Sequence, residues 1–349
     1  MEMNLTELRA DTALDGVLVI DKPPGWTSHD VVAKVRRLVG IRKVGHTGTL
    51  DPAASGVLVL CLGKATRIAE YLVLADKAYR ATLRLGIATD TQDATGVVVQ
   101  RHLGPWPHEE QIRSVMQSFV GAGRQLPPMY SAVKVKGVPL YKAARAGRSV
   151  QRATRECIIH ELTILSLLRG TYENDGEAAS VGSGGGSTRT GPPPAVIVDV
   201  VFDVVCSKGT YVRTLCADIG ERLGVGGHLA QLERRRVGRF GLEEALTLDG
   251  LAEVIEREDI RARVHSLSEV LAELPAFTLD PLSSEGARHG TGVPAARIVR
   301  VEGRWSRGDA VRLYATDGRL LAIGKAPWGS DDANWAGSDT LLKIEKVLV

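Results

Sequence analysis

The sequence contains few cysteines, and their positions show no pairing pattern. Its 349 residues include four, and no two are separated by the two residues typical of a redox or zinc pair. Two of them fall in apolar runs that we interpret as strands, so we expect reduced, mostly buried thiols of a cytosolic protein. A disulfide framework and a zinc site are therefore excluded, and no metal is expected. The four are Cys61, Cys157, Cys206 and Cys216.

Long hydrophobic runs are also absent. No stretch approaches the roughly 20 apolar residues that a membrane span requires. The first 15 residues, MEMNLTELRADTALD, contain acids and lack the apolar region of a signal peptide. With 44% hydrophobic and 24% charged residues, the composition is that of an ordinary globular protein. These features predict a cytoplasmic protein without a membrane partner.

A strong excess of either charge is missing as well, since the net charge is +3. The basic residues are nevertheless unevenly placed, because seven lie between Lys134 and Arg155, a stretch with no acid. Such a cluster favours contact with a polyanion on one face of the protein. A solvated basic surface is the alternative interpretation, and charge alone does not decide between the two.

Hydrophobic periodicity indicates one large folded domain, followed by a C-terminal region with a different pattern of predicted elements. Residues 79–87, YRATLRLGI, alternate between apolar and polar, as a half-buried strand does. Thr27 or Ser28 is expected to cap a helix that Gly40 ends. Short strands with glycine turns after Pro275 predict a small all-β module. Further expected strands are 16–20, 57–62 and 196–207, with helices from about 109 to 120 and within 209–224.

A low-complexity segment interrupts the folded body. Residues 169–194 are rich in Gly, Ser and Pro, and such a composition cannot bury a hydrophobic core. We therefore expect an insertion on the surface of the protein, and the sequence gives no role for it.

One acid stands out at a turn rich in small residues. In RKVGHTGTLDPAASGVLVLCLGK, residues 42–64, Asp51 is the single acid, and it precedes an apolar run. Taken alone, an Asp-Pro pair indicates a turn or a cap rather than catalysis. Tyr79 on an apolar strand face and His46 in a glycine-containing loop likewise have ordinary structural interpretations. The wider pattern around Asp51 is therefore what assigns these residues a function.

The segments GVLVIDKPPGWTSHDVV and GHTGTLDPAASG closely resemble the catalytic motif of the TruB family of bacterial tRNA pseudouridine synthases. Four further segments resemble that family in the same order: AYRATLRLGIATDTQDATG, LPPMYSAVKVKGVPLYKAARAG, CSKGTYVRTLCADIG and AQLERRRVG. The C-terminal β module resembles the PUA domain that many members carry. The resemblance covers most of residues 15–349, but it is missing over 169–194 and weak near 326–338.

The resemblance implies an α+β fold. A pseudouridine synthase catalytic domain is expected over 15–273, with a mixed, largely antiparallel sheet flanked by helices, after an N-terminal tail at 1–14. Within this domain, 124–155 would form a basic RNA-binding segment. A small all-β PUA-like RNA-binding domain is expected over 275–349.

The implied reaction is isomerisation of a uridine in the T-arm of tRNA, in which the base is detached at N1 and reattached at C5. No group is added and no electron is transferred, so no cofactor is expected. The base must be flipped out of its stack before it can react. The resemblance further implies a monomer that binds the T-arm stem-loop without a guide RNA.

Three residues are expected to carry the chemistry. Asp51 would act as nucleophile or proton-handling carboxylate; whether it attacks C6 of uracil, attacks C1′ of ribose or only moves a proton stays open. Arg213, in GTYVRTL, would pair with Asp51 and lower its pKa by favouring the ionised form. Tyr79 would stack on the uracil and reach the hydrogen that leaves C5.

Other residues are expected to bind the RNA. His46 would enter the space that the flipped uridine vacates, Leu232 would pack on the other side of the base, and Lys22 would support the turn. Phosphate contacts are expected from two basic clusters. Their members are Arg234, Arg235, Arg236 and Arg239 in the first, and Lys134, Lys136, Lys142, Arg145, Arg148 and Arg152 in the second.

Two alternative functions remain compatible with the sequence. The protein would act chiefly as a tRNA-folding or RNA-binding factor, with the PUA module and the basic segment as its working surface. Alternatively, it would be a guide-RNA-dependent synthase, a class that shares the Asp turn. An intact set of Asp51, Tyr79 and Arg213 favours catalysis, and the basic segment 124–155 favours the stand-alone bacterial type.

Overall fold

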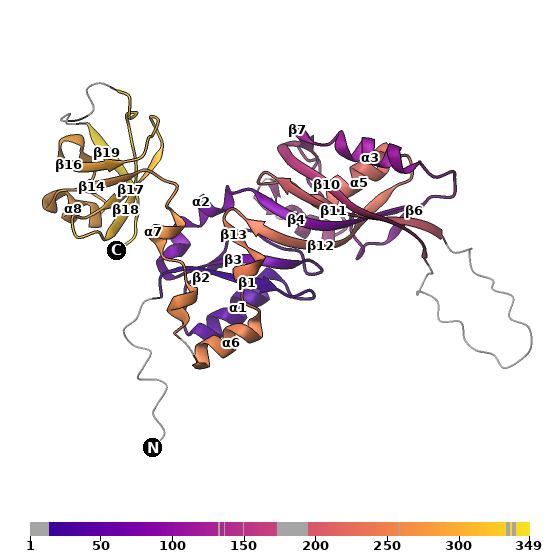
Figure 1. Ribbon diagram of the computed structural model, residues 1–349, viewed down its shortest axis with the longest axis horizontal. Coiled ribbons are helices and arrows are strands. Elements are labelled where there is room, and N and C mark those ends of the chain that lie inside the picture. The colour runs from indigo at the N-terminus through magenta and orange to yellow at the C-terminus, as the bar shows by residue number, and fades with distance from the viewer. Residues whose placement is uncertain are drawn as a thin grey trace, which may run out of the picture.

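The computed structural model describes residues 14–131, 133–135, 137–148, 150–172, 195–257, 259–332, 336 and 340–349. These residues form an elongated molecule (Figure 1). A small C-terminal module lies at one end, and the large sheet extends from it to the other end, where helix α3 (Glu109–Gln117) also lies. The tail predicted for 1–14 lies outside the described residues except for Leu14.

One mixed sheet organises the larger part of the chain. Nine of the described strands form it, in the order β1-β3-β12-β4-β11-β10-β7, with β2 beside β3 and β13 beside β12. Every pairing is antiparallel except that of β12 with β3, which confirms the predicted sheet type. The strands are β1 (Gly16–Lys22), β2 (Val44–His46), β3 (Ser55–Leu62), β4 (Lys77–Leu85), β7 (Gly121–Gln125), β10 (Arg155–Tyr172), β11 (Ala195–Cys206), β12 (Gly227–Val237) and β13 (Phe240–Gly241).

The half of the sheet around β1 and β3 is covered by α1 (Ser28–Val39) and α6 (Leu248–Arg257). Helix α1 begins after Thr27, which accepts a hydrogen bond from the Asp30 amide in a capping box. It ends at Gly40, whose φ of 76° is the left-handed conformation that glycine adopts without strain. Thr27, rather than Ser28, is therefore the cap.

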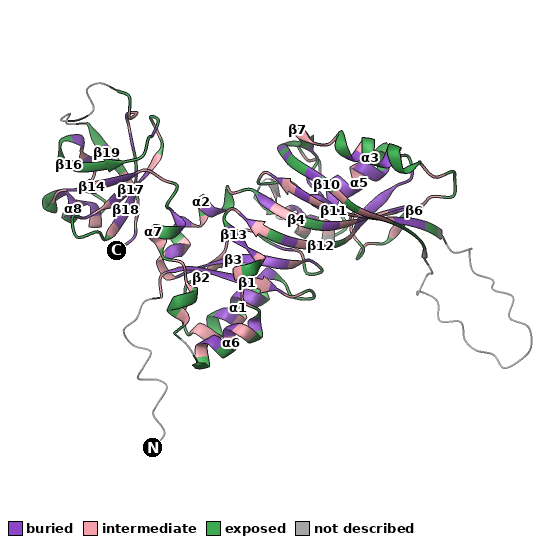
Figure 2. Ribbon diagram, viewed as in Figure 1, coloured by how far each residue is buried: buried purple, intermediate pink, exposed green. Residues whose placement is uncertain are grey.

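The half of the sheet around β4, β11 and β10 is covered by α3 and α5 (Val212–Arg222). Leu215 of α5 and Phe202 of β11 are fully buried in this second core. In Figure 2, buried residues of these strands and helices line the interior of this half of the protein. The start of α5, where Arg213 lies, is thereby fixed against the sheet.

Strand β10 extends further than the sequence indicates. Residues 169–172 continue β10 and pair with β11 up to Tyr172 opposite Ala195. The predicted start of the insertion at 169 is therefore wrong, because the strand ladder overrides the local Gly-containing composition. The rest of the predicted insertion, 173–194, lies outside the described residues.

Short elements connect these strands and helices. They are η2 (Gly63–Ile68), α2 (Ala69–Val73), β5 (Ile87–Thr89), β6 (Val98–Arg101), β8 (Lys134–Val135), β9 (Val138–Pro139), α4 (Leu140–Arg145), η3 (Leu242–Glu244), η4 (Ile260–Arg263) and α7 (Leu267–Val270).

The C-terminal module is a separate six-stranded sheet with its own core, formed around Phe277, Trp305 and Leu342. It also contains one short helix, which Asp280 caps and Pro281 begins. Its elements are β14 (Ala276–Leu279), α8 (Pro281–Arg288), β15 (Val293–Pro294), η5 (Ala295–Arg297), β16 (Ile298–Glu302), β17 (Ala310–Tyr314), β18 (Leu320–Lys325) and β19 (Leu341–Val347).

The C-terminal module is packed onto the rest of the protein. Ile323 and Leu348 are buried in the same hydrophobic cluster as Val237 and Phe240 of the large sheet. Arg312 donates hydrogen bonds to the carbonyl groups of residues 274 and 272, at 2.8 and 3.2 Å. The module is therefore packed against the large domain, and its removal would expose apolar surface of that domain.

We expect Leu348→Ala to lower the free energy of unfolding by about 2–5 kcal/mol, since it opens a cavity between the two parts. Urea-induced unfolding would measure this change. Leu341→Ala is the matched control, because Leu341 is 57% exposed at the start of β19 and should change the stability by less than about 0.5 kcal/mol. Equal stabilities of the two variants would show that Leu348 does not join the parts.

Candidate active site

The turn that carries Asp51 is held by hydrogen bonds to the start of α1. The Leu50 amide donates a hydrogen bond to Ser28 Oγ at 2.9 Å, and Ser28 Oγ donates to the Leu50 carbonyl at 3.2 Å. On the other side of Asp51, the Gly25 amide donates to the Pro52 carbonyl at 2.8 Å. The backbone is therefore anchored on both sides of Asp51.

Lys22 joins the two turns next to Asp51. Its side chain is fully buried, and Nζ donates to the carbonyl groups of Pro23, Trp26 and Pro52 at 2.9, 2.8 and 3.2 Å. Burial lowers the Lys22 pKa to about 8, and the Arg234 charge acts in the same direction. These contacts fit the supporting role that the resemblance predicts for Lys22.

Arg213 reaches Asp51 from the first turn of α5, 162 residues away in the sequence. Its Nε lies 3.0 Å from Asp51 Oδ2, and its Nη2 donates to Oδ1 at 3.4 Å. This is the two-point geometry that a guanidinium offers to a carboxylate. The arginine is only 6% exposed, whereas 40% of the Asp51 side chain remains open to solvent. A substrate can therefore reach the carboxylate but not its partner.

A second carboxylate shares Arg213. Arg213 Nη1 donates to Asp93 Oδ2 at 3.3 Å, and the other Asp93 oxygen accepts the hydroxyls of Thr91 and Thr95 at 2.7 and 2.6 Å. Sequence reasoning assigned Asp93 no role. The signal that was available is an acid with threonine two residues away on each side, in the family-like segment DTQDATG.

The pKa of Asp51 is raised above its usual value of 3.8. Desolvation by burial is the largest cause, and the negative charge of Asp93 acts in the same direction. The cations of Arg213, Lys22 and Arg234 oppose it. The predicted lowering of this pKa is therefore wrong: Arg213 does favour the ionised form, but burial outweighs it. A raised pKa makes the carboxylate a stronger base.

Tyr79 lies beside an arginine that sequence reasoning had placed on the surface. In the register of β12 with β4, Arg234 stands opposite Tyr79, and their side chains share a hydrogen bond. Burial raises the Tyr79 pKa, so the phenol stays neutral. Arg234 is 2% exposed and donates to the carbonyl groups of Val57 and Gly48 at 2.7 and 3.0 Å. The predicted phosphate contact of Arg234 is therefore wrong, because its guanidinium is committed to the interior.

The other members of that arginine cluster also have partners. Arg235 pairs with Glu233 at 2.7 Å, Arg236 donates to the Gly238 carbonyl at 2.7 Å, and Arg239 donates to the Glu269 carbonyl at 2.8 Å. Of these, Arg235 and Arg239 are exposed.

Leu232 and His46 border the same region. Leu232 pairs with Ala81 in the register of β12 with β4, and it packs with Tyr79 at the edge of the core beneath them. His46 ends β2, and its ring lies edge-on to His29 with centroids 5.4 Å apart. Burial lowers the His46 pKa, so the ring is neutral. Its Nδ1 has no hydrogen-bond partner among the residues that the structure describes.

The predicted basic segment is anchored to the site at its N-terminal end. Arg213 Nη2 donates to the Tyr130 carbonyl at 2.9 Å, and the Tyr211 amide donates to Gln125 Oε1 at 2.9 Å. Of the basic residues, Lys142 and Arg148 are exposed, whereas Arg152 donates to the Pro127 carbonyl at 2.8 Å. Lys136 and the side chains of Lys134 and Arg145 lie outside the described residues.

In the described ranges, no group of three or more His, Cys, Asp or Glu side chains is placed to bind a metal ion. Nor does any described helix have the length and apolar character needed to cross a membrane.

Comparison with family models gives the same identification over three parts of the chain. Residues 36–182 match the N-terminal domain of TruB family pseudouridylate synthases. Residues 213–275 match the C-terminal domain of tRNA pseudouridylate synthase B, and residues 276–348 match the PUA domain. These three matches include Asp51, Tyr79 and Arg213.

Individual relatives are similar at high coverage. The chain is 42% identical to tRNA pseudouridine synthase B of Thermobifida fusca, over 90% of this chain and 96% of that protein. It is 44% identical to tRNA pseudouridine synthase B of Syntrophotalea carbinolica, over 90% and 93%. Among solved structures, a chain of a Cbf5-Nop10-Gar1 complex is similar with a TM-score of 0.69 at 29% identity, over 97% of this chain and 86% of that chain. The chain therefore belongs to the TruB family of pseudouridylate synthases, and its C-terminal module is a PUA domain.

Proposed function

We propose that this protein isomerises a uridine in the T-arm of tRNA to pseudouridine, acting alone and without a cofactor. The C1′–N1 bond of the nucleotide breaks, the C1′–C5 bond forms, a proton leaves C5, and N1 ends protonated. Atoms and electrons balance within the one nucleotide. The relatives named tRNA pseudouridine synthase B support tRNA as the substrate.

The observation that carries this proposal is the arrangement of Asp51 on Arg213. A carboxylate anchored through its backbone, paired at two points and left partly open is placed to meet one atom of a bound nucleotide. Such fixed placement of reacting groups supplies much of an enzyme's rate. Its raised pKa makes Asp51 a stronger base than an ordinary aspartate, and Tyr79 is the side chain that reaches the hydrogen leaving C5.

The neighbouring side chains have complementary tasks in this proposal. The uridine is flipped out of its stack, at a cost of a few kcal/mol, because Asp51 cannot reach the ring or the sugar inside a stacked loop. Tyr79 and Leu232, adjacent on β4 and β12, offer an apolar floor on which uracil stacks. His46 is a neutral, partly buried ring five residues from Asp51, and it occupies the space that the base leaves.

The test is mass spectrometry of a T-arm hairpin after incubation with the pure protein. We expect one uridine to become pseudouridine, which cyanoethylation detects although the mass is unchanged. A hairpin with cytidine at that position is the control and should show no modified base. Binding of the hairpin without conversion would support the RNA-binding alternative instead.

A guide-RNA-dependent synthase would also fail to convert the isolated hairpin, and added total RNA would restore its activity. The identity of 42–44% to relatives named tRNA pseudouridine synthase B, against 29% to a chain that belongs to a Cbf5-Nop10-Gar1 complex, supports action without a guide. Conversion that depends on added RNA would overturn this part of the proposal.

Contacts with RNA phosphates predict how the binding affinity depends on salt concentration. If Lys142 and Arg148 contact phosphates, the Lys142→Gln/Arg148→Gln variant should flatten the dependence of log affinity on log salt concentration by about 1.4–1.8, which is roughly 0.7–0.9 for each lost contact. Filter binding from low to high salt measures the slope. Arg113→Gln/Arg261→Gln removes two exposed charges that already pair with Glu109 and Asp259, and it should keep the wild-type slope. Equal slopes for both variants would assign Lys142 and Arg148 to a solvated surface.

A further inference from the structure

We propose that Trp26, Lys34 and Arg37 form a second nucleotide-binding subsite, in which the unpaired base next to the target uridine stacks on the Trp26 indole. This inference rests on the proposed function, since it names a further contact with the same RNA. The ligand is an unstacked nucleotide of a loop, recognised by its aromatic face and its phosphate.

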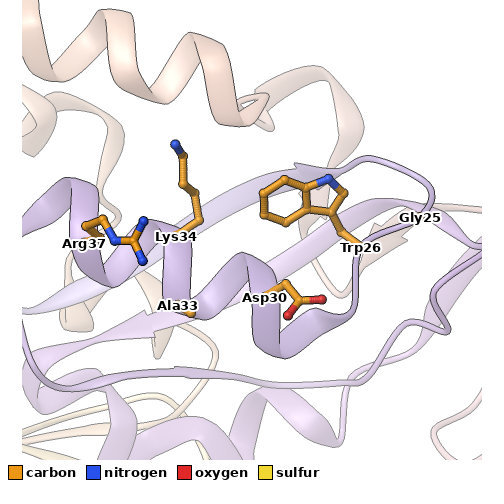
Figure 3. A pocket seen from close by; sticks show the side chains of 6 residues that line it. All are labelled: Gly25, Trp26, Asp30, Ala33, Lys34 and Arg37. Atoms are coloured by element: carbon orange, nitrogen blue, oxygen red, sulfur yellow. The ribbon is translucent and has the colours of Figure 1, made fainter.

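A cleft of about 420 Å³ opens beside α1 and the turn that precedes it. Its lining side chains recur at the spacing of one helix face, and Trp26 extends along that face just before the helix begins (Figure 3). Trp26 is 37% exposed, although tryptophan is a highly buried residue on average. The lining residues are Gly25, Trp26, Asp30, Ala33, Lys34 and Arg37.

The cleft is cationic although it contains one acid. Asp30 Oδ2 accepts hydrogen bonds from the Thr27 amide and hydroxyl at 2.9 and 2.6 Å, so this carboxylate serves the helix cap. Neither Lys34 nor Arg37 forms an ion pair with any residue in the described part of the chain. Two cations beside an open aromatic face are thus left for a ligand, and this combination binds single-stranded nucleic acid.

The position of the cleft links it to the active site. The Gly25 amide donates to the Pro52 carbonyl, and Lys22 Nζ bridges the carbonyl groups of Trp26 and Pro52. The Trp26 backbone is therefore tied directly to the turn that carries Asp51. The proposal therefore places the uridine at Asp51 and the adjacent nucleotide of the loop across this turn, at Trp26.

A purely structural role for Trp26 makes a different prediction. Trp26 precedes the N-cap of α1, and Val31 is the buried residue with which a hydrophobic staple would pair it. A staple needs apolar bulk but no aromatic face. Trp26→Leu would then preserve the function of this residue, and RNA affinity would not change.

The experiment measures affinity for the T-arm hairpin in the Asp51→Asn background, which leaves the uridine unconverted. Base stacking contributes roughly a 5- to 150-fold factor in affinity. We expect Trp26→Leu to lose a factor in this range while its melting temperature stays near wild type, and Trp26→Phe to stay within about threefold. Lys34→Gln and Arg37→Gln should weaken binding and flatten the salt dependence, with Arg113→Gln as the charge-matched control on α3.

Hairpins with a single abasic nucleotide identify the partner base. At one loop position beside the target uridine, the abasic hairpin should bind Trp26 and Trp26→Leu proteins equally, because the stacked base is missing in both. Loss of affinity that no abasic position removes, or no loss at all, would overturn the subsite while wild-type conversion of the uridine still stands. If the wild-type protein converts no uridine, the proposed function fails, and the subsite fails with it.

Discussion

Asp51→Asn is expected to lower the single-turnover rate of pseudouridine formation by at least about 10³-fold, while hairpin affinity stays within a few-fold of wild type. The amide has the shape of the carboxylate but neither its charge nor its basicity, so chemistry is lost and binding is kept. Rapid quench with saturating protein gives the rate, and filter binding gives the affinity. Measurable turnover by Asp51→Asn at a rate near wild type would remove Asp51 from the reaction.

The pH dependence of the same rate tests how Asp51 works. Its pKa is raised above 3.8, so the ionised fraction, and with it the rate, should fall at a higher pH than for an ordinary aspartate. Asp93 contributes to this raised pKa through its negative charge. Asp93→Asn should therefore shift the acidic limb of the profile to lower pH. A limb that does not move would show that Asp93 acts on Arg213 alone.

The Asp51 turn and its partner arginine could be predicted, because both lie in short segments whose residue pattern is specific. The helix that supports the turn could be predicted as well, since Thr27 and Gly40 are ordinary start and stop residues. The direction of the Asp51 pKa shift could not be predicted from the sequence. Its pKa depends on burial and on Asp93, which folding brings to Arg213 from another loop.

The burial of Arg234 follows from the alternation of side chains along a strand, which the predicted basic surface did not take into account. Three consecutive arginines suggest a basic surface, but on a strand alternate side chains point to opposite faces. Arg235 is accordingly exposed, whereas Arg234 points inward to Tyr79 and two carbonyl groups. A period of two applied to β12 would have distinguished the buried Arg234 from the exposed Arg235.

The docking of the PUA domain had no such local signal, because Leu348 is one apolar residue among many near the C-terminus.

Arg213→Lys is expected to lower the single-turnover rate by roughly 10²-fold or more. The guanidinium serves Asp51, Asp93 and the Tyr130 carbonyl in three directions at once, at distances from 2.9 to 3.4 Å. A lysine places one compact charge at the end of a flexible chain, so it cannot satisfy them together. Misplacement of a reacting group by about 1 Å is enough for an effect of this size.

The matched control for this variant is Arg84→Lys. Arg84 forms the same two-point contact with Asp199, at 2.8 and 2.7 Å across β4 and β11, and it is also partly buried. Replacement of Arg84 should change the rate little. Any loss of stability that follows from breaking a two-point contact should lower the melting temperature of both variants. If both variants react at the wild-type rate, the fork on Asp51 is not required for catalysis.

Combination with Asp51→Asn then separates a direct from an indirect role of Arg213. If the arginine acts by placing Asp51, its replacement costs nothing further once that carboxylate is gone, so the double variant should react no more slowly than Asp51→Asn alone. If Arg213 instead contacts the RNA, the two losses multiply. Arg213 is only 6% exposed, and four of its five N–H groups contact Asp51, Asp93 or the Tyr130 carbonyl, which favours the first outcome.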